Sequence, residues 1–453
     1  MNKIENAPDT KKLDWAIKSV DKFCTLPWLN LNTNPNGNIK LCCSIPLDTF
    51  VSDKDTTSYN LGYHDIDEIW DSVYMQYVRE RKIKGQGAPD CQDCYKVEKL
   101  SGHSPRMGQN AMWLLHTQKD KELSTYLDTN LIKKSVSQLP VSLELRLGNQ
   151  CNLQCVSCWG MSSSLIHQER KEYLDKNYLD EPKLGWLKSK WKTEQTIVDN
   201  TDVHNWFETE TFYNNFKKMA PTLRRLYTTG GEPTLIKANY KMFEMLLEAN
   251  NTDCQIEFTS NMTTWNQSFY SKLEKFKNVE IQMSIDGVGE VGEYIRYPSD
   301  FAKVRENVDK AVELASTRPG WKIKCYTVLQ AMNFKHVMPI WSMLYLLSSK
   351  HDQQITWWPI TLSAPEFLSL STIPKNIREE YIELITKQSA NYRKYYNDAP
   401  NRFVVDDHTF NAYKDSVLNS SYNSELSDRL KYFIEFNDRQ RGLNGAELFK
   451  DIL

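Results

Sequence analysis

From about Leu143 onward, short apolar runs alternate with longer amphipathic stretches. The short runs have the character of strands and lie at residues 143–147, 224–229, 255–260, 280–285, 322–328 and 355–360. The stretches between them carry apolar residues at roughly helical spacing and include 240–250, 268–277, 301–315 and 336–350. Strands that alternate with helices are typical of a parallel sheet with crossover helices. The pattern therefore predicts an α/β fold, in which six strand–helix units over residues 141–362 form a partial (β/α)6 barrel like part of a TIM barrel.

The regions around this pattern are less regular. Residues 101–140 are expected to form a helical linker, and an insertion around 160–220 is long for a single crossover. Within it, the stretch 186–206 is too polar and irregular for one helix. Residues 363–453 are expected to add further helices without a chemical motif. Residues 1–100 are rich in Asn, Asp, Pro and Cys and show little periodicity, which predicts a small domain stapled by something other than a large core.

Composition and charge narrow the class of protein. The chain has 453 residues, of which 40% are apolar, so it is long enough for one large domain with smaller additions. Its 56 basic and 58 acidic residues nearly cancel, so nucleic acid is not implied as a partner. No apolar signal segment follows the first residues, and the most apolar stretch, 337–349, is too short to cross a bilayer. We therefore expect a cytoplasmic protein with no membrane partner.

Cysteines are grouped along the chain. Eight of the ten lie in tight groups before position 160, and reduced thiols in such groups indicate a metal. Cys151, Cys155 and Cys158 form C-x3-C-x2-C just after the first predicted strand. Because a [4Fe–4S] cluster normally takes four cysteine ligands, three close thiols indicate a cluster with one iron open to another molecule; a zinc site or a chance grouping of buried thiols is the alternative. Cys254 and Cys325 stand alone and are expected to pack in the core.

Further motifs follow the ends of the next predicted strands. They are Gly230, Gly231, Glu232 and Pro233 in GGEP, Ser260 and Asn261 in TSNM, Ser284 and Asp286 in SIDG, and the later Arg296. Because the carboxyl ends of barrel strands meet at one rim, these residues are expected to converge on one site. Each also has an ordinary alternative: a plain turn for GGEP, a turn cap for Asp286 and a surface ion pair for Arg296.

In this order, the motifs of residues 143–362 resemble those of the radical S-adenosylmethionine (SAM) superfamily. The resemblance implies a partial barrel of the radical SAM type, in which the open iron of a [4Fe–4S] cluster chelates the amino and carboxylate groups of SAM. Reduction then cleaves SAM and releases a 5′-deoxyadenosyl radical that abstracts a hydrogen atom. Residues 293–308 resemble the peptide-modifying branch of the superfamily.

The same resemblance implies roles for individual residues. The GGEP glycines and Glu232 would receive the SAM amino group, and Ser284 and Arg296 would contact SAM. The chain departs from the family at Ser157, where an aromatic residue usually precedes the third cysteine. Trp159 is expected either to take over the contact with adenine or to pack in the core.

The N-terminal cysteines form a second pattern, C-x12-G-x4-C with Gly37 as its glycine, followed by C-x2-C. It resembles twitch, a shortened form of the SPASM domain. The resemblance implies an auxiliary [4Fe–4S] cluster with four ligands, which are Cys24, Cys42, Cys91 and Cys94, and it leaves Cys43 spare. The module usually follows the barrel, whereas here it precedes it, and zinc is the alternative metal.

These cofactors imply a radical SAM oxidoreductase that modifies a peptide, a protein side chain or a small metabolite, with the auxiliary cluster in electron transfer. A reductant such as flavodoxin or ferredoxin is the expected protein partner. Two alternatives stay open. One is a sulfur-inserting enzyme that uses the auxiliary cluster as donor, although four N-terminal thiols favour a complete cluster. The other is a noncatalytic metal-binding scaffold.

Overall fold

The computed structural model describes residues 12–45, 50–52, 58–394, 403 and 405–453. The chain divides into two compact units, each assembled from segments that are far apart in the sequence. Unit 1 comprises Met1–Gly148, Asp202–Thr229 and Ala238–Cys254, and unit 2 comprises Asn149–Thr201, Gly230–Lys237 and Gln255–Leu453. Among the described residues, no helix combines the length and the apolar character needed to cross a membrane.

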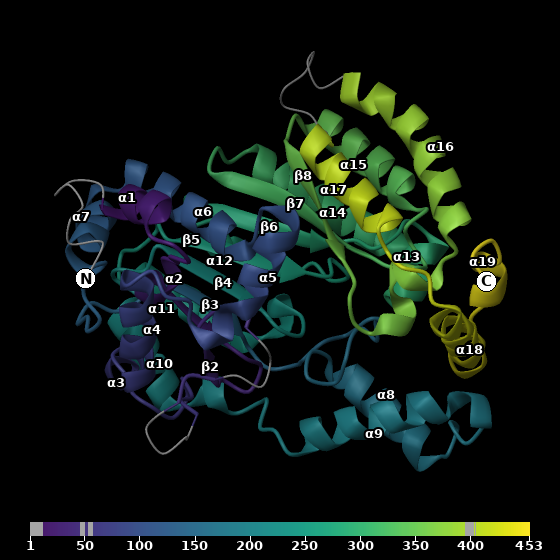
Figure 1. The fold of residues 1–453 in the computed structure, drawn as a ribbon, viewed down its shortest axis with the longest axis horizontal. Coiled ribbons are helices and arrows are strands. Elements are labelled where there is room, and N and C mark those ends of the chain that lie inside the picture. Colours follow the sequence, from purple (N-terminus) through teal and green to yellow (C-terminus); the bar gives the residue numbers. More distant parts are fainter. Residues whose placement is uncertain (1–11, 46–49, 53–57, 395–402, 404) are drawn as a thin grey trace. The chain divides into compact units, whose positions relative to one another are not determined.

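Unit 1 contains strands in the order β2, β1, β3 and β4, of which β2, β3 and β4 are labelled in Figure 1. Their bounds are β1 (Asn30–Thr33), β2 (Ile39–Lys40), β3 (Ser142–Arg146) and β4 (Arg225–Thr229). β1 pairs antiparallel with β2 and parallel with β3, and β3 pairs parallel with β4. Leu31, Leu143 and Leu226 stand in register on β1, β3 and β4 and are buried. β3 and β4 match predicted strands, whereas β1 is a further parallel strand that the sequence pattern did not predict.

The helices of unit 1 include α1 (Lys12–Ser19), α2 (Leu26–Leu29), α3 (Ile66–Trp70), α4 (Val73–Ile83), α5 (Gln92–Ser101), α6 (Pro105–Lys119), α7 (Lys121–Asn130), α10 (Glu210–Met219) and α11 (Lys237–Glu248). The prediction that the first hundred residues lack a substantial core is wrong. Phe23, Trp28 and Trp70 are fully or almost fully buried, and the rings of Phe23 and Trp28 stack 5.9 Å apart. Short helices and loops supply these aromatic residues, so they leave no helical period in the sequence.

Unit 2 contains four parallel strands in chain order: β5 (Gln255–Ser260), β6 (Val279–Ser284), β7 (Trp321–Leu329) and β8 (Ile355–Thr361). Each lies within two residues of its prediction. Ile281, Ile323 and Ile355 stand in register on β6, β7 and β8 and form part of the core. Helices follow these strands in the chain as crossovers: α12 (Gln267–Leu273), α13 (Glu290–Ile295), α14 (Phe301–Ser316) and α15 (Val337–His351). Cys325, on β7, is fully buried, as is Cys254 in unit 1.

The remaining helices of unit 2 are α8 (Ser164–Asp175), α9 (Gly185–Asp199), α16 (Lys375–Lys394), α17 (Asp407–Leu418), α18 (Ser424–Arg441) and α19 (Gly445–Leu448). The expectation that 186–206 is too polar for one helix is wrong for most of that stretch, because α9 covers it as far as Asp199. Leu187, Trp191 and Val198 give α9 a buried face, which is enough to hold a helix whose other faces are polar.

Candidate functional site

The three cysteines of C-x3-C-x2-C lie on an irregular loop of unit 2, between Asn149 and the start of α8. Burial raises the pKa of Cys151 to about 11 and that of Cys155 to about 12, and the charges of neighbouring cysteines act in the same direction. Cys158 is one of these neighbours, and its charge raises the pKa of both Cys151 and Cys155. The three thiols therefore lie near enough to interact electrostatically, in surroundings where only a bound cation would keep them ionised at neutral pH. Among the described residues, no three His, Cys, Asp or Glu side chains are grouped so that they could hold a metal ion as they stand.

Main-chain hydrogen bonds attach this loop to the segment around Arg296. The N–H of Gln154 donates to the carbonyl of Tyr297 at 2.6 Å, and the N–H of Val156 donates to the carbonyl of Ile295 at 2.9 Å. The residues immediately before and after Arg296 are thus hydrogen-bonded to the cysteine loop. The sequence spacing between the two segments gives no hint of this pairing.

The GGEP turn packs on the first part of the same loop. Gly230 has a positive φ of 96°, which favours glycine. A Cβ on Gly231 would lie 1.9 Å from the carbonyl oxygen of Gln150, so only glycine fits there. The N–H of Glu232 donates to that same carbonyl at 2.7 Å. Pro233 is buried and starts a short 3-10 helix. The two glycines therefore let the main chain approach the residue next to Cys151.

Glu232 connects three of the motifs. Its side chain is only 1% exposed. Its Oε1 accepts from Ser260 Oγ at 2.9 Å and its Oε2 accepts from the N–H of Asn261 at 2.7 Å. The amide of Asn261 in turn donates to Asn152 Oδ1 at 2.8 Å. Burial raises the pKa of Glu232, and these hydrogen bonds oppose the rise. Ser260 and Asn261 thus orient the carboxylate, and Asn152 ties the group to the cysteine loop.

The buried Asp286 forms an ion pair with Arg296, whose side chain is 16% exposed, and Arg296 Nη2 lies 2.7 Å from Asp286 Oδ2. Asp286 Oδ1 also accepts from the N–H of Val328 at 2.7 Å. Arg296 Nε is buried and has no hydrogen-bond partner in the part of the chain that the structure describes. The charge of Arg296 acts on Cys155. Arg296 is therefore not in a surface ion pair. Ser284 ends β6 and is partly exposed.

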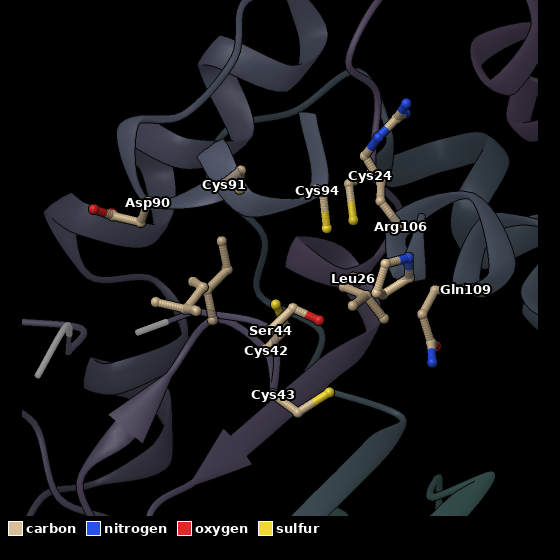
Figure 2. Close-up of a pocket in the computed structure, with 13 residues that line it drawn as sticks. Cys24, Leu26, Cys42, Cys43, Ser44, Asp90, Cys91, Cys94, Arg106 and Gln109 are labelled. Atoms are coloured by element: carbon tan, nitrogen blue, oxygen red, sulfur yellow. The ribbon is translucent and has the colours of Figure 1, made fainter. Parts of the chain in front are cut away.

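The five N-terminal cysteines line one cavity of unit 1 (Figure 2). Its lining also includes Leu26, Leu41, Ser44, Ile45, Asp90, Pro105, Arg106 and Gln109. In Figure 2 the side chains of Cys24 and Cys94 extend into this space in the same direction. Burial raises the pKa of Cys24 to about 11, and Cys91 acts electrostatically on Cys24, Cys42 and Cys94. These four thiols thus share one cavity.

The spare cysteine has different neighbours. The charges that act on the Cys43 thiol belong to Glu144, Arg146 and Arg225. The Cys43 side chain is exposed. Gly37, with a φ of 82°, makes the turn between β1 and β2 that brings the chain back to Cys42. This geometry favours Cys42 over Cys43 as the fourth thiol of the group.

Comparison with known families agrees with both sites. The family model for the radical SAM superfamily matches residues 145–329. The chain therefore carries a radical SAM domain. A second family model, for the SPASM iron–sulfur cluster-binding domain, matches residues 24–95. The predicted resemblance, with SPASM before the radical SAM domain, is confirmed, as are the α/β fold class with its helical C-terminal part and the expectation of a SAM-binding [4Fe–4S] cluster, SAM and auxiliary iron–sulfur.

Solved structures that align with this chain have low sequence identity to it. SuiB from Streptococcus suis, bound to S-adenosylmethionine, is 12% identical over 75% of this chain and 67% of its own, with a TM-score of 0.36. SuiB bound to its precursor peptide SuiA is 13% identical over 80% and 68%, with a TM-score of 0.33. anSMEcpe with bound AdoMet is 18% identical over 63% and 68%, with a TM-score of 0.34. None of the curated proteins matches the chain.

The residues of the radical SAM domain fit its cofactors. Three cysteines leave one position of a four-iron cluster to another molecule. The buried Nε of Arg296 lacks an acceptor among the described residues, and a carboxylate such as that of SAM would supply one. Within the described part of the chain, Glu232 Oε2 accepts a single hydrogen bond, so it can accept another from an ammonium group.

Sequence reasoning missed residues that support these sites. Arg170, on α8, donates from Nη2 to the carbonyl of Cys158 at 2.6 Å and pairs with Glu194 on α9. Lys82, on α4, is fully buried and its Nζ lies 3.4 Å from the sulfur of Cys91. Neither residue belongs to a motif, and the sequence holds no signal that would have found them.

Proposed function

We propose that this chain reductively cleaves SAM and abstracts a hydrogen atom from its substrate, with the SPASM cluster in electron transfer. When bound, the catalytic cluster supplies the electron that splits SAM into methionine and a 5′-deoxyadenosyl radical. Cys151, Cys155 and Cys158 would hold this cluster, and the four N-terminal thiols other than Cys43 would hold the auxiliary one. A reductant such as flavodoxin or ferredoxin would deliver the electron, and the cytoplasm would keep the thiols reduced.

The observation that carries this proposal is the placement of Arg296. The charge of its guanidinium acts on Cys155 in the cysteine loop, and Asp286 fixes the guanidinium through an ion pair. Its Nε has no acceptor among the described residues. A purely structural buried arginine would have its N–H groups satisfied. An unsatisfied donor beside three thiols suits an anionic group that binds next to them, as the SAM carboxylate would.

The surrounding residues would bind and orient SAM. Glu232 would accept from the ammonium group, held in place by Ser260 and Asn261. Gly230 and Gly231 would let the main chain lie against the ligand, and the hydroxyl of Ser284 would supply a further hydrogen bond. Each of these groups binds or orients, and the structure assigns no acid or base among them.

We propose a peptide or protein side chain as the first substrate class to test, ahead of a small metabolite. Residues 293–308 support this choice, because their arrangement resembles the peptide-modifying branch of the family. Among the aligned structures, SuiB is bound to a precursor peptide and another anSMEcpe structure holds a peptide. Those peptides are ligands of those proteins, and for this chain they only suggest which substrate class to test first.

Anaerobic reconstitution followed by reduction with SAM tests the proposal. Wild-type protein should bind about eight irons, in two four-iron clusters, and form 5′-deoxyadenosine slowly without substrate. The triple variant Cys151→Ala, Cys155→Ala, Cys158→Ala should keep about half the iron and form none. The matched control, Cys254→Ala with Cys325→Ala, should keep all the iron because both thiols are packed in the core. Full iron without 5′-deoxyadenosine in the wild type would instead support a noncatalytic scaffold.

A further inference from the structure

A fully buried lysine stands beside the N-terminal cysteine group. Lys82 lies near the end of α4 and has no exposed surface. Its Nζ donates to the hydroxyl of Tyr95 at 2.6 Å and to the sulfur of Cys91 at 3.4 Å. No carboxylate in the described part of the chain lies within ion-pairing distance of this ammonium. The lysine is therefore buried against a phenol and a thiol.

This arrangement is unfavourable unless an anion is bound. An ammonium group buried without a counter-charge destabilises the fold, and a phenol hydroxyl offers only a neutral acceptor. Lys82 also acts electrostatically on Cys24, so its charge reaches two of the four thiols. Four thiolates give a ligated [4Fe–4S] cluster a net negative charge, and such a cluster would supply the missing counter-charge.

We propose that Lys82 is the counter-charge of the auxiliary cluster and raises its reduction potential. The inference rests on the proposed function, because it requires iron–sulfur at this site. Net charge and hydrogen bonds to the sulfurs are among the factors that set the potential of such clusters. A fixed positive charge stabilises the reduced cluster more than the oxidised one, because reduction adds an electron. Tyr95 acts as a positioning residue, since its hydroxyl holds Nζ against Cys91.

A hydrogen bond from Lys82 to Cys91 alone would raise the reduction potential of the cluster less than a positive charge does. Lys82→Arg keeps the positive charge, whereas Lys82→Met keeps the length of the side chain and removes both charge and donor. Lys84, two residues further along at the C-terminal cap of α4, offers a matched control. It is exposed and already paired with Glu80 at 2.6 Å, so solvent and salt screen its charge.

The test uses full-length protein with Cys151, Cys155 and Cys158 replaced by Ala, so that only the auxiliary cluster titrates. In this background, EPR-monitored redox titration of Lys82→Met should show at least a tenfold lower ratio of reduced to oxidised cluster at a given potential. For one electron this is a shift of about 59 mV to lower potential. Lys82→Arg should stay close to the parent protein, and Lys84→Met should not shift.

The outcomes separate this inference from the proposed function. Lys82→Met with full iron and an unchanged potential would overturn the inference while leaving the proposed function intact. Loss of iron in Lys82→Met but not in Lys82→Arg would support it, because the charge would then be needed to assemble the cluster. Loss of iron in both variants would show that Lys82 acts through packing, and this would overturn the inference. Zinc in the parent protein would overturn the inference together with the electron-transfer role of the N-terminal site.

Discussion

The guanidinium of Arg296 lies 2.7 Å from the carboxylate of Asp286, and Asp286 is buried while the Arg296 side chain is 16% exposed. Asp286 is also anchored from the other side, because its Oδ1 accepts from the N–H of Val328 on β7. The pair therefore fixes Nη2 of the guanidinium, whereas Nε has no acceptor among the described residues. An arginine held in this way is pre-organised to receive a carboxylate.

Replacing Arg296 should weaken SAM binding more than it lowers iron content. A hydrogen bond between charged groups contributes about 1.5–3 kcal/mol, so Arg296→Met should reduce SAM affinity about tenfold or more at unchanged iron content. Asp286→Asn should have a smaller effect, because it loosens the guanidinium without removing it. Calorimetric titration of reconstituted protein with SAM measures both. Arg305→Met, at an exposed position on α14, is the matched control. SAM affinity that is the same in Arg296→Met and Arg305→Met would remove Arg296 from the site.

The neighbouring cysteines Cys42 and Cys43 should behave differently. Cys42 interacts electrostatically with Cys24 and Cys91, whereas Cys43 is exposed and faces Glu144 and Arg146. In protein that lacks the three catalytic cysteines, Cys42→Ala should lose most of its iron and Cys43→Ala should keep about four irons. An iron assay of the two variants would record this difference. The reverse result would exchange the two assignments.

Arg170 should act as a support for the catalytic cysteine loop. It donates to the carbonyl of Cys158, and its guanidinium also lies over the ring of Trp191 on α9. Removing a group that orients a metal ligand typically weakens metal binding about tenfold to a hundredfold, so Arg170→Met should lose catalytic iron to a chelator about tenfold faster. Lys171→Met, at the next and exposed position, is the control. Equal rates of iron release in the two variants would restrict Arg170 to a packing role.

A pH-dependent contribution to stability is expected from Asp120 in unit 1. Its side chain accepts from the N–H of Leu123 at 3.0 Å and from Arg224 Nε at 2.6 Å. Burial raises the pKa of Asp120, but these two interactions outweigh burial and lower it below its usual value. A depressed carboxyl pKa stabilises the folded state above the unfolded value of about 3.9, and that stabilisation is lost as the pH falls through the folded pKa.

Asp120→Asn isolates the charge, because asparagine is an equally good N-cap for α7. At pH 7 the variant should be less stable by about 0.5–1 kcal/mol, the range for partly exposed ion pairs. The difference should shrink towards zero at pH 3. Urea unfolding of metal-free protein at the two pH values would measure it. A difference that persists at pH 3 would show that shape and not charge is responsible.

Much of the fold follows from local patterns in the sequence. β5 spans the residues expected for it, and β6, β7 and β8 differ from their predictions by one or two residues. Buried parallel strands are short apolar runs, and the ends of such runs are set by nearby polar and glycine residues. The cysteine spacings, GGEP and the strand-end polar residues were likewise visible, because each motif is contained in a few consecutive positions.

Other features depended on contacts between distant parts of the chain. β1 pairs with β3 across more than a hundred residues, and the polar, short segment that forms it has no strand-like period of its own. The sequence of α9 shows no clear helical period, because only a narrow stripe of its residues is apolar and buried. Long-range pairing of this kind is set by the core that the elements share and not by local preference.

The sequence by itself determined which residue types we propose as cofactor ligands and their order along the chain. The tertiary structure decided which groups support them: Asp286 against Arg296, Asn152 against Asn261, Arg170 against Cys158 and Lys82 against Cys91. The physical reason is that ligand identity follows from the chemistry of a side chain, whereas a buried charge or amide is placed by whatever partner the fold brings to it.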